Sequence, residues 1–185
     1  MTIPNSLAAA RPLTKLSALV LVTLTVLAAA LAGPFMSNAE ASTTSCSDGS
    51  SSLTICMITE PDVTNAVIFY PQIQLHAGQR VSVRAGGCYQ TGGSGKTWKR
   101  FVDPLSHNPD EYKGLLYIPG TAGPMFLSDA LTATFTVQRD TPVAIGVNDD
   151  NGYSDNGYWG RAGDDGTENQ CVGYPNAWVQ FFIYN

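Results

Sequence analysis

Short runs of alternating hydrophobic and polar residues fill the chain after Ser42, and turn-forming Gly, Pro, Asn and Asp interrupt them about every eight to twelve positions. The alternation is clearest in 131–137, where four hydrophobic side chains alternate with three threonines, and it recurs in 80–85. Successive side chains of a β-strand point to opposite faces, so this pattern predicts strands with one buried and one solvated face.

The same criterion predicts strands along most of the chain, at 53–59, 66–70, 80–85, 97–102, 114–118, 131–137, 143–147 and 177–184. No segment after Ser42 has the 3.6-residue periodicity of an amphipathic helix. The last strand is apolar at nearly every position, which predicts a central strand covered on both faces, with Trp178 in the core. We therefore expect an all-β fold, an antiparallel β-sandwich formed as one domain by 42–185.

The first 41 residues have a different character. Arg11 and Lys15 precede an apolar run, 16–32, and Ala39-Glu40-Ala41 forms a small-x-small pattern before Ser42. This order is typical of a cleaved secretory signal peptide, with an uncleaved membrane anchor as the alternative. We expect a secreted protein whose mature chain lacks a transmembrane span, because no later apolar run approaches 20 residues.

The exported part contains an even number of cysteines, namely Cys46, Cys56, Cys88 and Cys171. In an exported chain this predicts two disulfides, for which three pairings exist. A bond between Cys46 and Cys56 would close a short Ser/Gly-rich turn and leave Cys88 and Cys171 to join two distant loops. A zinc site is disfavoured, since there is no C-x-x-C spacing and the two histidines stand apart.

Charge is concentrated in one segment. The chain has a net charge of −5, and residues 148–170 hold six acidic side chains against one arginine. An acidic chain without a basic cluster argues against a nucleic-acid partner. Crowded carboxylates repel one another, and a hard cation with oxygen ligands relieves the repulsion, so we interpret 148–157 as a calcium-binding loop. A solvated acidic loop with Asn-Gly turns is the alternative.

Two other segments carry polar groups without a chemistry of their own. The glycine-rich stretch 85–98 contains Gly-Lys-Thr, but it lacks the upstream glycine and the following helix of a phosphate-binding loop. The sequence His107-Asn108-Pro109-Asp110-Glu111 predicts a proline-containing turn.

In their order along the chain, these segments resemble the calcium-dependent galactophilic lectins of the PA-IL type found in bacteria. The resemblance spans about 63–184 and includes 67–70, 78–81, Ala85-Gly86, Pro109-Asp110-Glu111 with Gly114-Leu115, and the Asn-Asp loop from 148. It implies a small β-sandwich of the jelly-roll or galactose-binding type. In such a protein one Ca²⁺ bridges the protein loops and the sugar hydroxyls.

The resemblance also implies roles for individual residues. Side-chain calcium ligands would be Asp149, Asp155 and Asn156, with one carbonyl from Tyr153 or Ser154 and another from Gln90 or Thr91. Sugar contacts would come from Asn108, Asp110, Glu111, Asp149 and Asp155. The chain departs from the family pattern at Asn108, where a histidine is usual, at Glu111, where an amide is usual, and in the insertion 159–170. The sugar is therefore left open.

Three functions follow from these patterns. We expect a secreted calcium-dependent carbohydrate-binding protein without catalytic activity, either as a single chain or as a homo-oligomer. A secreted glycoside hydrolase is one alternative, because paired carboxylates can act as acid and base, although exposed loops are poorly suited to raise a carboxyl pKa. A structural or partner-binding protein with a loop-stabilising calcium is the other.

Overall fold

The computed structural model describes residues 42–92, 97–106, 108–118, 123–150, 152–159 and 170–185. These described residues all belong to one compact unit. The predicted signal peptide, His107 and all but the ends of the insertion 159–170 lie outside the described residues, as do three of the six acidic residues of 148–170. Within the described residues, no helix is long and apolar enough to span a membrane.

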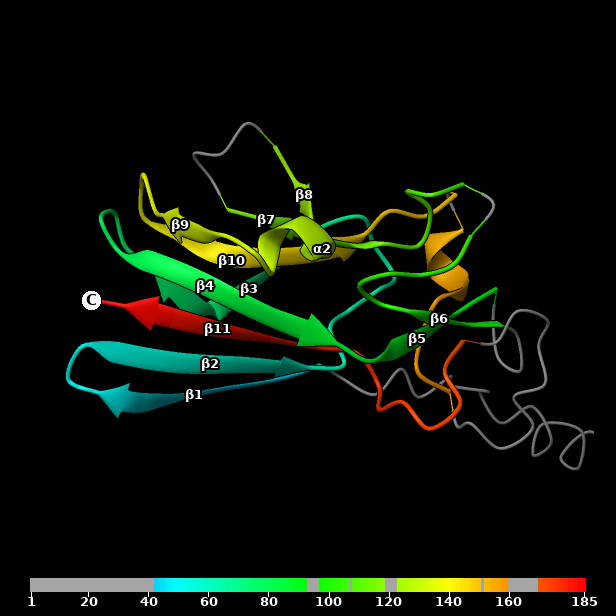
Figure 1. Ribbon diagram of the computed structural model, residues 1–185, viewed down its shortest axis with the longest axis horizontal. Helices are drawn as coiled ribbons and strands as arrows, with labels where there is room; N and C mark the ends of the chain where they lie inside the picture. The colour runs from blue at the N-terminus through cyan, green and yellow to red at the C-terminus, as the bar shows by residue number, and fades with distance from the viewer. Residues whose placement is uncertain (1–41, 93–96, 107, 119–122, 151, 160–169) are drawn as a thin grey trace, which may run out of the picture. The chain divides into compact units, whose positions relative to one another are not determined.

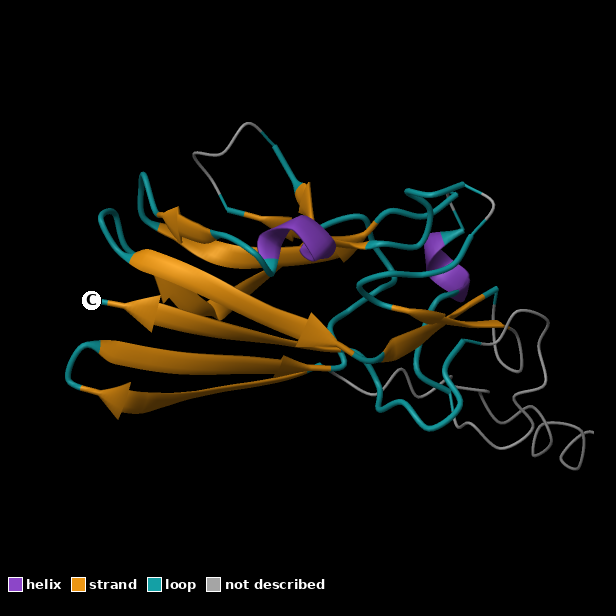
Figure 2. Ribbon diagram, viewed as in Figure 1, coloured by secondary structure: helices purple, strands orange, loops and turns teal. Residues whose placement is uncertain are grey.

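Antiparallel sheets form the fold of the described residues, which confirms the all-β prediction (Figures 1 and 2). The larger sheet has the order β1 (Thr43–Ser50), β2 (Leu53–Thr59), β11 (Trp178–Tyr184), β4 (Arg80–Gly86) and β9 (Thr134–Thr136). The second has the order β3 (Ile68–Leu75), β10 (Thr141–Val147), β7 (Gly114–Tyr117) and β8 (Met125–Phe126). A separate hairpin pairs β5 (Cys88–Thr91) with β6 (Thr97–Arg100).

The sheets are packed together around one cluster of buried side chains. Strands of both sheets contribute to this cluster, with Ile58, Val83 and Phe181 from the larger sheet and Ile73, Leu116 and Ile145 from the smaller. Burial of these aliphatic and aromatic side chains is the main source of stability, at about 1.5–3 kcal/mol for each fully buried large side chain. The packing agrees with the sandwich that the alternating strands predict.

The last strand, β11, is central as predicted, between β2 and β4. It is not covered on both faces, however. Val179, Phe181 and Ile183 are buried between the sheets, whereas Trp178, Gln180 and Phe182 are only half-buried on the outer face. The prediction that Trp178 lies in the core is therefore wrong, because an apolar residue on a strand can also pack along the outer face of its own sheet.

Two further expectations are corrected. The predicted strand 131–137 is reduced to Thr134–Thr136, because the short helix α2 (Leu127–Ala130) precedes it and leaves Leu131 exposed. The strands β1, β5 and β8 are absent from the predictions. Strand β1 is a Ser/Thr-rich edge strand whose side chains are almost all exposed, so it carries no alternating hydrophobic signal.

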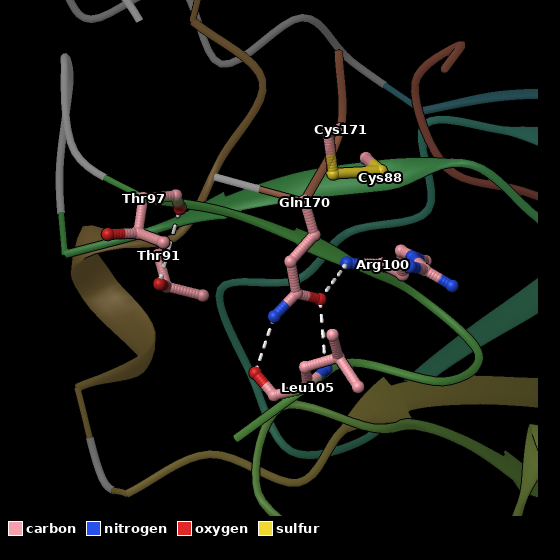
Figure 3. The surroundings of a disulfide bond; sticks show 7 residues. All are labelled: Cys88, Thr91, Thr97, Arg100, Leu105, Gln170 and Cys171. Atoms are coloured by element: carbon pink, nitrogen blue, oxygen red, sulfur yellow. Dashed lines mark hydrogen bonds between the residues drawn. A yellow bond between two sulfur atoms is a disulfide. The ribbon is translucent and has the colours of Figure 1, made fainter. Parts of the chain in front are cut away.

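Both disulfides connect the cysteine pairs that the spacing suggested. Cys46 and Cys56 are cross-strand neighbours in β1 and β2, with their Cα atoms 4.0 Å apart. Cys88, at the start of β5, joins Cys171 across 83 residues. Beside this bond the Gln170 side chain accepts hydrogen bonds from the backbone N–H groups of Arg100 and Leu105, at 3.4 and 2.9 Å (Figure 3).

Candidate functional site

The glycine-rich segment and the acidic loop meet through their backbones. The hairpin β5–β6 lies beyond the ends of β2 and β4, near the short 3₁₀ helix η1 (Tyr153–Asp155) (Figures 1 and 2). Gln90 and Gly157 exchange two backbone hydrogen bonds, of 2.9 and 3.0 Å. Residues far apart in the sequence are thereby held side by side at the C-terminal end of the acidic loop.

The proline-containing turn joins the same place through Asn148, the first residue after β10. The Asn148 side-chain amide donates to the carbonyl of Asp110 at 2.7 Å, and the Asn148 carbonyl accepts from the N–H of Tyr112 at 2.5 Å. The N–H of Asn148 donates to the Lys113 carbonyl at 2.8 Å. Three backbone segments therefore converge, and we call Gln90, 108–113, 148–150 and 152–157 together the loop junction.

Asn156 is the most buried polar side chain of the acidic loop, with 2 % of its surface exposed. Its Nδ2 donates to the Val63 carbonyl at 3.0 Å and to Oδ2 of Asp149 at 2.5 Å. Its Oδ1 is buried and accepts no hydrogen bond from any residue that the structure describes. A buried acceptor without a partner costs about 1–3 kcal/mol, so this oxygen is arranged for a positively charged or hydrogen-donating ligand that the protein itself does not supply.

Two more carboxylates of the acidic loop lie close to Gly152. A side chain at Gly152 would place its Cβ 3.1 Å from Oδ1 of Asp155 and 3.4 Å from Oδ1 of Asp150, so both acids turn toward the same glycine. The two acids are exposed, while Asp149 is half-buried. Oxygen-rich groups of this kind suit a hard cation such as Ca²⁺ better than a soft metal.

Burial raises the pKa of the Asp149 carboxyl above its ordinary value, while the hydrogen bond from Asn156 opposes the rise. The neutral form of Asp149 is thus favoured in the folded protein relative to an exposed aspartate. A bound cation would reverse this preference, because it stabilises the ionised carboxylate.

Tyr112 is a residue of the loop junction that the sequence did not single out. Burial raises its pKa to about 12, and the negative charges of four neighbouring carboxylates add to the rise, those of Asp150, Glu111, Asp149 and Asp155. Its backbone has a φ of +66°, a left-handed conformation that costs a non-glycine residue about 1–3 kcal/mol. The buried Tyr89 hydroxyl donates to its carbonyl at 2.9 Å and helps to hold it there.

The other predicted ligands lie at the loop junction but have internal partners. The carbonyl of Tyr153 accepts a hydrogen bond from the N–H of Asn156 at 3.2 Å. The carbonyl of Gln90 accepts one from the N–H of Gly157. Asp155 is exposed on η1. In the described part of the chain, no group of three or more His, Cys, Asp or Glu side chains could hold a metal ion. An ion here would therefore depend on amide and carbonyl oxygens in addition to carboxylates.

The predicted sugar-binding residues form a self-supported turn. Oδ1 of Asn108 accepts the N–H of Asp110 at 3.3 Å, and the Asp110 carboxylate lies 3.2 Å from Nζ of Lys113. The hydroxyl of Ser106 donates to the Glu111 carboxylate at 2.7 Å. These bonds orient the turn, and the exposed side chains of Asn108 and Asp110 remain accessible to a ligand.

Comparisons of the chain with protein-family models, with curated proteins and with solved structures find no match.

Proposed function

We propose that the protein is a secreted carbohydrate-binding protein whose loop junction holds Ca²⁺ and, through it, the hydroxyl groups of a sugar. The observation that carries this proposal is the buried Oδ1 of Asn156, which has no hydrogen-bond partner and adjoins the half-buried Asp149 carboxylate. The sequence resemblance to calcium-dependent galactophilic lectins points to the same two residues. The two disulfides fit the oxidising environment that secreted proteins meet.

The donor set at the loop junction fits calcium. Asp149 and Asn156 would hold the ion through a carboxylate and an amide oxygen, and Asp155 would add a second carboxylate. The carbonyls of Gln90 and Tyr153, each of which accepts one backbone hydrogen bond, would add neutral oxygens. Calcium takes six to eight oxygen ligands and tolerates irregular geometry, which leaves positions for the neutral oxygens of two adjacent hydroxyls.

The proline-containing turn is suited to orient a sugar beside the ion. Asn148 ties the turn to the first residue of the acidic loop, so Asn108, Asp110 and Glu111 lie on a segment that cannot move independently of Asp149. Carboxylate and amide oxygens on such a turn would accept hydrogen bonds from sugar hydroxyls, and the amide N–H groups would donate to them. Because Asn108 and Glu111 differ from the lectin pattern, the resemblance supports a hexose as ligand more strongly than galactose itself.

Glycan-array binding in 2 mM Ca²⁺ and in excess chelator tests this function. We expect binding to at least one hexose-terminated glycan that chelator abolishes. The variant Asp149→Asn should lose the binding, since it removes the charge and keeps the shape and the hydrogen bond from Asn156. Asp48→Asn, which removes an exposed carboxylate from strand β1, serves as the matched control and should bind like the wild type. Equal binding by Asp149→Asn and the wild type would contradict the proposal.

The raised pKa of Asp149 favours a second candidate, a glycoside hydrolase in which this residue is the general acid. Such an enzyme would release reducing ends from polysaccharides, and the release would decrease in Asp149→Asn. Absence of product from a polysaccharide panel that the protein binds would leave the carbohydrate-binding function alone.

A further inference from the structure

A hollow of about 530 Å³ opens on the outer face of the larger sheet, apart from the loop junction. Its lining contains the indole of Trp178 and the apolar Met57 and Pro175, together with the polar side chains of Thr59, Glu60, Asn176 and Gln180. Volumes of this size are typical of small-molecule sites, which combine an apolar surface with a few placed polar groups. None of the residues proposed for the calcium ion or its sugar belongs to this lining.

The indole of Trp178 lies on a rigid support. Trp178 is on the central strand β11, where it pairs with Thr59 of β2 and Gly86 of β4. A side chain at Gly86 would place its Cβ 3.2 Å from Cζ2 of the indole, so the ring packs over the glycine. The half-buried indole is therefore held in place by backbone and keeps part of its surface on the hollow.

The polar rim is fixed in the same way. Glu60, directly after β2, has a φ of +54°, and its N–H donates to the Ala177 carbonyl at 2.9 Å. Its carboxylate accepts a hydrogen bond from Nδ2 of Asn176 at 2.5 Å. A left-handed conformation in a residue other than glycine costs about 1–3 kcal/mol, and residues of this kind cluster at functional sites. The rim is thus ordered before any ligand binds, which lowers the entropic cost of binding.

We infer that this hollow is a second, calcium-independent carbohydrate subsite, in which the indole of Trp178 contacts the C–H face of a neutral pyranose ring. Aromatic surface covers the apolar face of such a ring, and Glu60, Asn176 and Gln180 provide acceptors and donors for its hydroxyls. Glu60 is the only charged residue among the described ones that line the hollow, so its carboxylate disfavours phosphorylated, sulfated or other anionic ligands.

Isothermal titration of the purified protein with cellohexaose, xylohexaose and a linear galactohexaose, in excess chelator, tests this inference. We expect at least one of these neutral oligosaccharides to bind the wild type. Trp178→Ala should bind about tenfold more weakly or worse, while Trp178→Tyr should retain part of the affinity. Phe182→Ala is the matched control, because Phe182 is a half-buried aromatic on the same face of β11, four residues along, and lies under Arg84 at 5.2 Å from the ring centroid to Cζ.

The outcomes separate this subsite from the loop junction. Asp149→Asn should lose only the binding that chelator removes, whereas Trp178→Ala should lose only the binding that persists in chelator. No binding of any neutral hexaose in chelator overturns the inference, as does an equal loss in Trp178→Ala and Phe182→Ala. Binding of tetramethylammonium but of no oligosaccharide also overturns it, since the indole would then serve as a cation site. Melting temperatures of the variants close to that of the wild type establish that each is folded.

Discussion

Replacement of Asn156 by aspartate tests directly whether the loop junction is built for a cation. In the folded protein, Nδ2 of Asn156 lies 2.5 Å from Oδ2 of Asp149. The variant Asn156→Asp exchanges this donor for an oxygen and brings two carboxylates together in a partly buried place. Without a cation, one of the two must bind a proton or the pair must separate, because carboxylates this close cannot both ionise cheaply.

The expected loss of stability in Asn156→Asp follows from the contacts that change. The variant loses a hydrogen bond to a charged acceptor, worth about 1.5–3 kcal/mol. It also gains repulsion between two carboxylates, which lowers the stability further. We expect the calcium-free variant to be less stable by roughly 3 kcal/mol, which corresponds to a fall in melting temperature of about 6–12 °C for a domain of this size. Calcium should restore most of this loss, since the ion supplies the positive charge that the paired carboxylates require.

Thermal unfolding with excess chelator and with 2 mM Ca²⁺ measures both effects. The calcium-induced rise in melting temperature should be larger for Asn156→Asp than for the wild type, as expected for a ligand that binds only the folded state. Asn65→Asp adds the same charge to an exposed turn. It should change the stability by no more than about 0.5 kcal/mol, with chelator or with Ca²⁺. An equal calcium-induced rise in melting temperature in Asn156→Asp and the wild type would contradict a cation site at this pair.

Three other predictions concern the fold. Removal of the disulfide in a Cys88→Ser/Cys171→Ser double variant should cost about 4–5 kcal/mol in denaturant unfolding, because the bond closes a loop of 83 residues; a cost below about 1 kcal/mol would contradict this. Gly146→Ala should not yield a folded protein, judged by circular dichroism, since the new Cβ would lie 1.7 Å from the Ala66 carbonyl oxygen. The Ala77 N–H and His76 lower the pKa of Asp140, so its interactions stabilise the protein above the unfolded pKa near 4 and are lost as pH falls through the lower folded value; Asp140→Asn should therefore melt below the wild type at pH 7 and together with it near pH 2.

Strands that bury one face were predictable because burial imposes a period of two on the sequence. The predicted boundaries 53–59 coincide with β2, and those of β4 and β11 differ from prediction by a single residue. Strands β1 and β5 lack this signal for different reasons. Residues of β1 are exposed and held by an edge pairing and a disulfide, while all four residues of β5 are buried.

The candidate site was predictable only where charge and residue type identify it. Asp149 and Asn156 stand out by residue type in an acidic loop, and the structure brings their side chains into contact. Tyr112 and the tie between Asn148 and the proline-containing turn could not be found from sequence, because they depend on hydrogen bonds between segments about 40 residues apart. The exposed hollow at Trp178 was missed for a related reason, since an apolar strand does not reveal which of its faces another sheet covers.

Calorimetric titration of the purified protein with Ca²⁺, in buffer freed of divalent ions, measures directly whether the loop junction binds calcium. We expect a saturable heat with one ion bound per chain, and loss of that heat in Asp149→Asn but not in Asp48→Asn. A protein that shows no saturable heat up to millimolar Ca²⁺, or the same heat in both variants, would contradict a calcium site at the loop junction.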